Sequence, residues 1–302
     1  MHDIHPYRPN ALAANPLDRA GQRRTDAAWV EAMLHDTGAR FLPVWRSKNL
    51  LEGRENSPPH AALLPAAAIG QAPDQLPWVF LGLLRQRAIF AVDLGGLDNP
   101  LPAGSVGDFE DLRRIGGAVP AADAAMLAHA RGMIHWRRRH RFCGVCGASC
   151  LPGSAGHVLL CQGCGTHHFP RTDPAVIMLV TSGDRALLGQ PTAFRNYRVF
   201  TTLAGFVEPG ETLEQAVARE VFEETGIRVA RARYHSSQPW PFPASIMLGF
   251  TADALDEAIT IDPHEIADAR WFTRDELRQP DGFVLPPDFS IARRLIEDWM
   301  AG

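Results

Sequence analysis

The chain has 302 residues, a formal net charge of −4 at pH 7, 46% hydrophobic residues and 21% charged residues. This composition is typical of a soluble globular protein, and the length allows two domains with cores of their own. No apolar run approaches the length of a membrane span, and the slightly acidic charge gives no general electrostatic footprint for nucleic acid. No N-terminal stretch joins positive charge to a hydrophobic run, and the final WMAG is not a peroxisomal address, so we expect a cytoplasmic protein.

The first half of the chain offers structural elements but no catalytic motif. Residues 1–25 are rich in Pro, Asn, Ala and Arg, which predicts poor order. The periodicity of the rest predicts a helix at 26–36, a strand at 39–45, a hairpin of strands at 78–84 and 88–94, and a helix at 120–140. Nothing in residues 1–130 matches a known catalytic pattern, so we expect the chemistry to lie further along the chain.

Four cysteines follow that helix as two CxxC pairs separated by fourteen residues: Cys143, Cys146, Cys161 and Cys164. Four thiolates match tetrahedral zinc, and a closed four-sulfur site is structural rather than catalytic. Disulfides are the alternative, but they leave Cys150 over and have no signal peptide to support them. The basic run at 137–141 allows a nucleic-acid-binding ribbon, although it also fits the last turn of a helix, where cations meet the dipole favourably.

The second half reads as a mixed α/β domain. Residues 174–181 form a nearly continuous apolar run, as a strand in a buried sheet requires. The remaining pattern predicts strands at 185–189, 198–203 and 246–251, and helices at 212–225 and 290–300. Together these elements predict an α/β (α+β) sandwich around a mixed sheet.

Residues 205–227 read GFVEPGETLEQAVAREVFEETGI and are the most informative segment. Pro209-Gly210 predicts a turn, and the apolar spacing after it predicts a helix that Gly226 ends in a left-handed conformation. Glu220, Glu223 and Glu224 fall at i, i+3 and i+4, so their carboxylates project from one face of that helix.

Three neighbouring carboxylates repel one another unless cations lie between them, and Mg²⁺ or Mn²⁺ prefers such oxygen ligands. Metals held there can polarise a phosphoryl oxygen, activate a water and offset charge on a leaving phosphate. We expect Arg219 to orient carboxylates of this site. The alternative for the glutamates alone is a solvated, charged helix face.

The complete segment, with Gly205, Glu211 and Arg219-Glu220 at their fixed spacing, resembles a Nudix box. The resemblance implies hydrolysis of a diphosphate joined to a second group X. It also implies that Glu220, Glu223, Glu224 and Arg219 are the catalytic residues, with the three glutamates as ligands of magnesium or manganese.

A second segment, SQPWPFPAS at 237–245, resembles the motif of the NADH pyrophosphatase branch of the Nudix family. Its three prolines in five residues exclude a helix and a central strand, which predicts a stiff loop. A stiff loop holds aromatic rings at low entropic cost, and a flat apolar slot suits a nicotinamide or a base. The resemblance implies substrate contacts from five of its residues: Ser237, Gln238, Trp240, Phe242 and Ser245. The alternative is a structural loop whose aromatic residues pack on the core.

Other positions match the same branch. Phe206 is a candidate to stack on the nicotinamide, and Phe169 matches an aromatic residue that helps to enclose it across a homodimer interface. Glu265, placed after the last strands, matches a late carboxylate of the metal site. Ala292 matches a position beside the adenine pocket.

The resemblance therefore predicts an N-terminal degenerate Nudix-like domain (1–138), a four-cysteine zinc ribbon (139–170) and a catalytic Nudix domain (171–302). It implies hydrolysis of NAD(H) to NMN(H) and AMP, and removal of the NAD cap from RNA. Two other functions stay open at this point. One is a broader pyrophosphatase acting on ADP-ribose or dinucleoside polyphosphates, and the other is a non-catalytic zinc-ribbon protein that binds nucleic acid.

Overall fold

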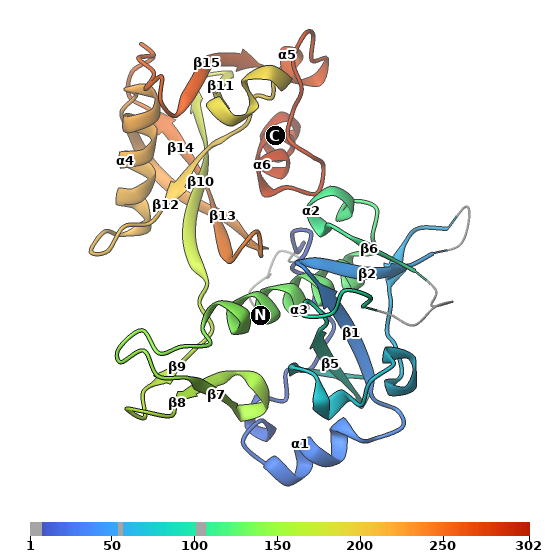
Figure 1. The fold of residues 1–302 in the computed structure, drawn as a ribbon. Helices are drawn as coiled ribbons and strands as arrows, with labels where there is room; N and C mark the ends of the chain where they lie inside the picture. The colour runs from blue at the N-terminus through green and yellow to red at the C-terminus, as the bar shows by residue number, and fades with distance from the viewer. Residues whose placement is uncertain (1–7, 54–56, 101–106) are drawn as a thin grey trace, which may run out of the picture. The chain divides into compact units, whose positions relative to one another are not determined.

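The computed structural model describes residues 8–53, 57–100 and 107–302 (Figure 1). Its contacts divide the chain into two compact units, each described here by itself. The N-terminal unit comprises residues 12–172 and Trp240–Ala244, and the C-terminal unit comprises residues 8–11, 173–239 and 245–302. Within the described part of the chain, no helix has the length and apolar character needed to cross a membrane.

The N-terminal unit is built on a mixed sheet in the order β3-β2-β1-β5-β4, with β6 paired to β2. Its central pair, β1 and β5, is parallel, and the neighbouring pairs are antiparallel. The strands are β1 (Arg40–Trp45), β2 (Lys48–Glu52), β3 (His60–Ala61), β4 (Trp78–Leu84), β5 (Arg87–Asp93) and β6 (Asp108–Glu110).

Helices cover both faces of this sheet because its strands alternate two sets of apolar side chains. Leu42 and Val44 face α3 (Ala121–Arg139), whereas Phe41 faces α1 (Ala27–Leu34). The core on the α3 side includes Trp136, which is 2% exposed. A short helix, α2 (Leu112–Ile115), precedes α3, and α3 ends in three arginines as the basic run predicted.

The ribbon belongs to the N-terminal unit. It is a three-stranded antiparallel sheet of β7 (Cys150–Gly153), β8 (Val158–Cys161) and β9 (His167–His168). Short 3-10 turns lie here and elsewhere in the chain, at Gly21–Arg23, Ala66–Ile69, Pro73–Gln75, Ser154–Gly156 and Thr192–Tyr197.

The C-terminal unit repeats the layered plan. Its sheet has the order β13-β14-β10-β11-β15, with β12 paired to β10 and a central parallel pair of β10 and β14. The strands are β10 (Asp173–Ser182), β11 (Arg185–Pro191), β12 (Leu203–Phe206), β13 (Val229–Trp240), β14 (Ser245–Ala254) and β15 (Ile266–Thr273).

Strand β10 separates two cores by simple alternation. Val176, Met178 and Val180 pack with α4 (Leu213–Thr225), while Ile177 and Leu179 pack with α6 (Ile291–Ala301). The short helix α5 (Arg274–Arg278) lies between β15 and α6 in the chain. The predicted fold class, an α/β sandwich on a mixed sheet preceded by a ribbon and a Nudix-like domain, is confirmed.

Four expectations need correction. Residues 198–202 form only isolated bridges, at Val199 and Thr201, and the regular strand β12 begins at Leu203. The stiff loop at 237–245 is shorter than expected, because the edge strand β13 continues to Trp240. Glu265 precedes β15 rather than following the last strand.

The fourth correction concerns the N-terminal segment. Residues 1–7 lie outside the described residues, but Leu12 and Leu17 are 2% and 7% exposed in the core of the N-terminal unit. Asp18 bridges to Leu83 by backbone hydrogen bonds. Poor order therefore does not extend to these residues, because their few apolar side chains find a core that composition does not reveal.

Candidate active site

A loop and the first turn of α4 set the position of the glutamates. Gly210 has a φ of 97°, a backbone conformation that glycine adopts without strain. Thr212 caps the helix by accepting from the backbone of Gln215, whose side chain accepts from Thr212 N in return. Gly226 ends the helix in the left-handed conformation, as its place in the sequence predicts.

Arg219 lies at the centre of a carboxylate cluster. Its Nε donates to Glu211 Oε2 at 3.0 Å, and its Nη1 donates to Glu220 Oε1 and Glu223 Oε2, both at 2.9 Å. Its Nη2 donates to Glu211 Oε1 at 2.6 Å and to the Phe206 carbonyl at 2.9 Å. These bonds raise the pKa of Arg219 and lower the pKa of Glu211, so both groups stay charged. The guanidinium thus fixes the loop to the helix.

Glu224 has no such partner. It is 7% exposed, and its Oε2 is buried without a hydrogen bond. Burial, followed by the charges of Glu220, Glu265 and Glu223, raises the pKa of Glu224 to about 8. An isolated buried carboxylate is costly, so this oxygen either keeps a proton or meets a cation.

Glu220 is held by close packing against the neighbouring strand. A Cβ added at Gly205 would lie 1.8 Å from the carboxyl carbon of Glu220, so only glycine leaves room for that carboxyl. Burial raises the pKa of Glu220, although Arg219 opposes the effect. The absence of a side chain at Gly205 therefore leaves space for the carboxyl of Glu220.

Glu265 joins this group from another element. It stands directly before β15, and its charge adds to those that raise the pKa values of Glu220 and Glu224. The backbone of Glu265 is fixed by hydrogen bonds with Thr192 and Asp262. All four predicted magnesium or manganese ligands are thus close enough for their charges to affect one another's pKa values.

The predicted substrate residues of the C-terminal unit fall into two groups. The Phe206 ring is 59% exposed, while its carbonyl is bound by Arg219 beside the glutamates. Gln238 is fully buried, and its Nε2 donates to the carbonyls of Ala11 and Phe289 at 2.9 and 2.8 Å. Its Oε1 accepts from Ile291 N at 2.8 Å, so the amide is used in fixing the start of α6.

The remaining candidates of the C-terminal unit lie in α6, β13 and β14. Ala292 and Ser245 are 5% and 9% exposed, in α6 and at the start of β14. Ser237 is half-buried, and its carbonyl accepts from Asn10 Nδ2 at 2.8 Å. Asn10 also donates to Ser236 Oγ at 3.0 Å. No local pattern indicates Asn10, because its hydrogen bonds reach residues more than two hundred positions away.

Trp240 and Phe242 are placed differently, because Trp240–Ala244 belongs to the N-terminal unit. Phe242 is 8% exposed and packs in the core beneath α3, with Trp240 against it at 5.0 Å between ring centroids. The guanidiniums of Arg113 and Arg131 lie 5.1 and 4.9 Å from the Phe242 ring. Their contact with substrate stays a prediction, and the structure gives both rings a packing role.

The four predicted zinc ligands meet at one point of the ribbon. Within the described part of the chain, theirs is the one group of three or more candidate ligands whose atoms all lie within 4.8 Å of one another. Backbone N–H groups of Cys164 and Gly163 donate to the Cys161 sulfur and lower the pKa of that thiol to about 6. Phe169, after β9, is 61% exposed. Cys150 is half-buried and lies outside this group.

Both donor sets fit the metals that the sequence predicts. Four sulfurs within 4.8 Å of one another suit zinc. The carboxylates of α4 suit a hard divalent cation, and the unpartnered Oε2 of Glu224 is the atom that such a cation would satisfy.

The layered fold, the glycine loop and the carboxylate helix define a metal-dependent Nudix hydrolase. The models of three families match the chain. These are the NUDIX domain at residues 171–297, the NADH pyrophosphatase-like rudimentary NUDIX domain at 38–136 and the NADH pyrophosphatase zinc ribbon domain at 138–169.

The chain is 42% identical over 230 residues to the NAD-capped RNA hydrolase NudC of Deinococcus radiodurans, an alignment that covers 74% of this chain and 77% of the relative. It is 48% identical over 169 residues to the protein of that name from Escherichia coli O1:K1, covering 56% of this chain and 63% of the relative. The chain therefore belongs to the NudC family of Nudix hydrolases, and the resemblance read from the sequence is confirmed.

Among solved structures, a NUDIX hydrolase from Nitrosomonas europaea matches with a TM-score of 0.42 and 27% identity, over 53% of this chain and 88% of that one.

Proposed function

We propose that this Nudix hydrolase cleaves the pyrophosphate of NAD(H) to give NMN(H) and AMP, and that it also removes the NAD cap from RNA 5′ ends. The observation that carries the proposal is the buried Glu224 Oε2, which has no hydrogen bond, within the glutamate cluster of α4. The relatives' printed name, NAD-capped RNA hydrolase, supports the choice of substrate.

We assign the residues as follows. Glu220, Glu223, Glu224 and Glu265 would hold magnesium or manganese, which supplies Lewis-acid stabilisation of phosphoryl charge when bound. Arg219 positions Glu211, Glu220 and Glu223 through the hydrogen bonds described above. One carboxylate of the cluster takes a proton from the attacking water. The exposed Phe206 ring offers a stacking surface for the nicotinamide beside this cluster.

The substrate test compares turnover of NADH, ADP-ribose and diadenosine polyphosphates by the purified chain with manganese. We expect NADH to be preferred, and NAD-capped RNA to yield RNA with a 5′-monophosphate. Much faster cleavage of ADP-ribose than of NADH would replace this proposal with that of a broader pyrophosphatase.

Three further parts of the proposal come from the family. The four-cysteine ribbon holds one structural zinc, in line with its family model and its gathered sulfurs. The chain forms a homodimer in which Phe169 of one protomer helps to enclose the nicotinamide bound by its partner. The three domains end near residues 138, 170 and 302, and the protein acts in the cytoplasm.

Light scattering tests the dimer. A monomer at working concentrations would remove the role given to Phe169.

A further inference from the structure

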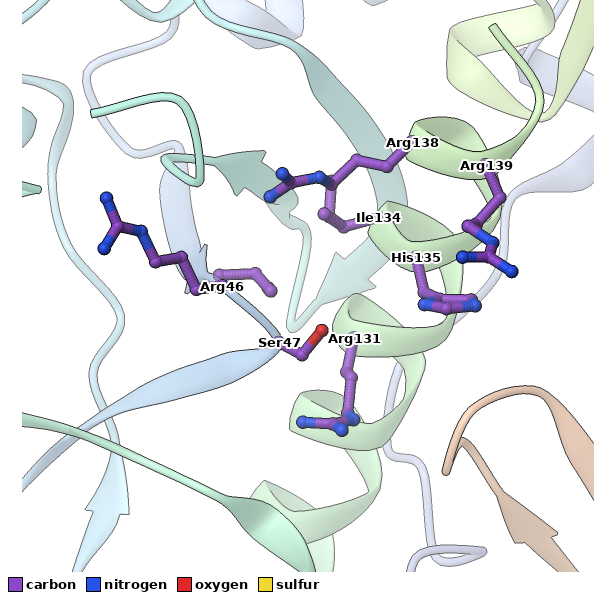
Figure 2. A pocket seen from close by; sticks show the side chains of 8 residues that line it. Arg46, Ser47, Arg131, Ile134, His135, Arg138 and Arg139 are labelled. Carbon is purple, nitrogen blue, oxygen red and sulfur yellow. The ribbon is translucent and has the colours of Figure 1, made fainter. Parts of the chain in front are cut away.

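A basic cavity of about 420 Å³ lies within the N-terminal unit, and none of its lining residues is assigned to hydrolysis. Figure 2 shows Arg46 and Ser47, from the turn between β1 and β2, across from the α3 side chains that line the rest of it. The lining residues are Val44, Arg46, Ser47, Arg131, Ile134, His135, Arg138 and Arg139. Four arginines, one histidine and no carboxylate are among them. Such a lining suits an anion.

The deepest of these groups is Arg131, which is 8% exposed. Its Nε donates to the Pro241 carbonyl at 2.9 Å, but its Nη1 is buried without a hydrogen bond. Asp111, at 3.6 Å from that nitrogen, lies beyond hydrogen-bonding distance. This nitrogen is closed to solvent, so Arg131 adds positive charge beside the cavity rather than a hydrogen bond to an anion inside it.

Arg138 lies against a neighbouring loop. A Cβ at Gly95 would lie 1.7 Å from Arg138 Nη1, so the guanidinium occupies space that only glycine leaves open. Asp93 lies at 3.4 Å from the same nitrogen, and its Oδ1 also accepts from Gly95 N at 2.8 Å. One carboxylate oxygen therefore serves two donors, and the arginine keeps most of its hydrogen-bonding capacity.

The other cations at the cavity are loosely engaged. Arg46 pairs with Asp98 at 3.1 Å, but Asp98 is almost fully exposed, and such surface pairs exchange easily for another anion. Arg139 and His135 stand one helical turn apart on α3. Burial and then the charge of Arg139 lower the pKa of His135, so the imidazole is available as a neutral hydrogen-bonding group.

We propose that this cavity binds a phosphate group, supplied either by the backbone of a nucleic-acid chain or by a free nucleotide. Arginine guanidiniums bind phosphate oxygens through paired, charge-assisted hydrogen bonds. Arg46, Arg138 and Arg139 provide the donors, and the buried Arg131 adds positive charge beside them. Ser47 adds a hydroxyl on the opposite side. The site goes beyond the proposed hydrolysis, because none of these residues belongs to the glutamate cluster.

The test measures binding to the full chain with zinc in place and no magnesium or manganese added, so that hydrolysis plays no part. The probes are inorganic phosphate, AMP and a labelled oligoribonucleotide with a 5′-hydroxyl end. The variant is Arg138→Gln with Arg139→Gln. Its matched control is Arg85→Gln with Arg87→Gln, which removes the same charge from exposed positions of the same unit.

We expect the Arg138/Arg139 variant to bind at least one phosphate probe about 10-fold more weakly than wild type, while the control stays within about 2-fold. If the source is a nucleic-acid chain, the oligoribonucleotide shows the loss, and the slope of log K against log salt falls by about 1 for each phosphate contact removed. If the source is a free nucleotide, the variant binds AMP more weakly than wild type does. AMP then displaces the oligoribonucleotide poorly from wild type, because the two probes do not share this site.

Equal binding by the two double variants would overturn the proposal, since it would show that only overall charge matters. Should the Arg138/Arg139 variant fail to fold, Arg139→Gln alone gives the answer, because that side chain is exposed at the end of α3. NADH hydrolysis by either variant should match wild type. Its loss in a folded variant with normal phosphate binding would also count against a separate site.

Discussion

The two units share one architecture and differ in the side chains placed upon it. Each has a mixed sheet with a central parallel pair, β1–β5 in one and β10–β14 in the other. Each sheet lies between two helices, α1 and α3 or α4 and α6, because strand residues alternate between two cores. The backbone plan alone therefore does not distinguish a catalytic unit from a supporting one.

The difference lies on the helices. Helix α4 presents carboxylates around Arg219, including the unpartnered oxygen of Glu224. Helix α3 presents three arginines about two helical turns apart, with Arg131 on one turn and Arg138 and Arg139 near the end of the helix. One surface is suited to cations that contact a diphosphate, and the other to the anion itself. The same fold thus carries surfaces of opposite charge, and substitutions on α4 or near α3 test each of them separately.

The largest effect is expected for Glu224→Gln. Removing the charge of a carboxylate in the cluster should lower kcat for NADH by about 10³-fold. Glu214→Gln is the matched control, because Glu214 lies on the same helix but is exposed in its first turn. Steady-state kinetics with saturating manganese measures both. Equal activity of the two variants would show that the Glu224 carboxylate has no special role in hydrolysis.

The next effect concerns the stability of the N-terminal unit. Cys143→Ser should release zinc and lower the free energy of unfolding by about 3 kcal/mol, because a metal site is lost. Cys150→Ser, outside the sulfur cluster, should keep its zinc and lose far less. Metal analysis and thermal unfolding provide the measurements. A Cys143→Ser variant that unfolds like wild type would contradict a structural zinc.

The same contrast shows which features of the site can be predicted from sequence. The glutamates of α4 were predictable because a helix places i, i+3 and i+4 on one face, whatever surrounds it. The ribbon was predictable because paired CxxC spacing has few other uses. Both are local patterns, so neighbours in sequence are sufficient to identify them.

What sequence missed depends on distant contacts. The roles of Asn10 and Gln238, which fix β13 and the start of α6, arise from partners far along the chain. The same holds for Phe242, whose packing between two arginines of the N-terminal unit no local pattern indicates. The cavity beside α3 joins a helix to a turn more than eighty residues earlier. Periodicity predicts an element's face, but not what lies opposite that face.

A smaller effect is expected for Gly205→Ala. The added methyl would meet the carboxyl of Glu220 at 1.8 Å, so the carboxyl must move while the strand keeps its place. Displacing one group of an active site by about 1 Å costs on the order of 10- to 100-fold in rate. Kinetics together with a melting curve would separate this loss from unfolding. Unchanged turnover would mean that Glu220 is not held where the reaction needs it.

The last effect is a pH dependence of stability that belongs to Glu224. In protein with zinc but no added magnesium or manganese, its folded pKa of about 8 lies above the ordinary value of 4.5. The folded state then binds the proton more tightly than the unfolded state. The resulting stability is fully present below about pH 4.5 and is lost as pH rises toward 8, by at most about 1.4 kcal/mol per pH unit.

Denaturant unfolding between pH 6 and 8 measures that slope, and Glu224→Gln should abolish the contribution of this residue because an amide does not titrate. Manganese should stabilise wild type more at pH 8 than at pH 6, since a cation binds the ionised carboxylate. Parallel curves for wild type and Glu224→Gln would show that the Glu224 carboxyl is already paired. The unpartnered oxygen of Glu224 would then no longer be evidence that α4 binds a cation, in contrast to the arginine-lined face of α3.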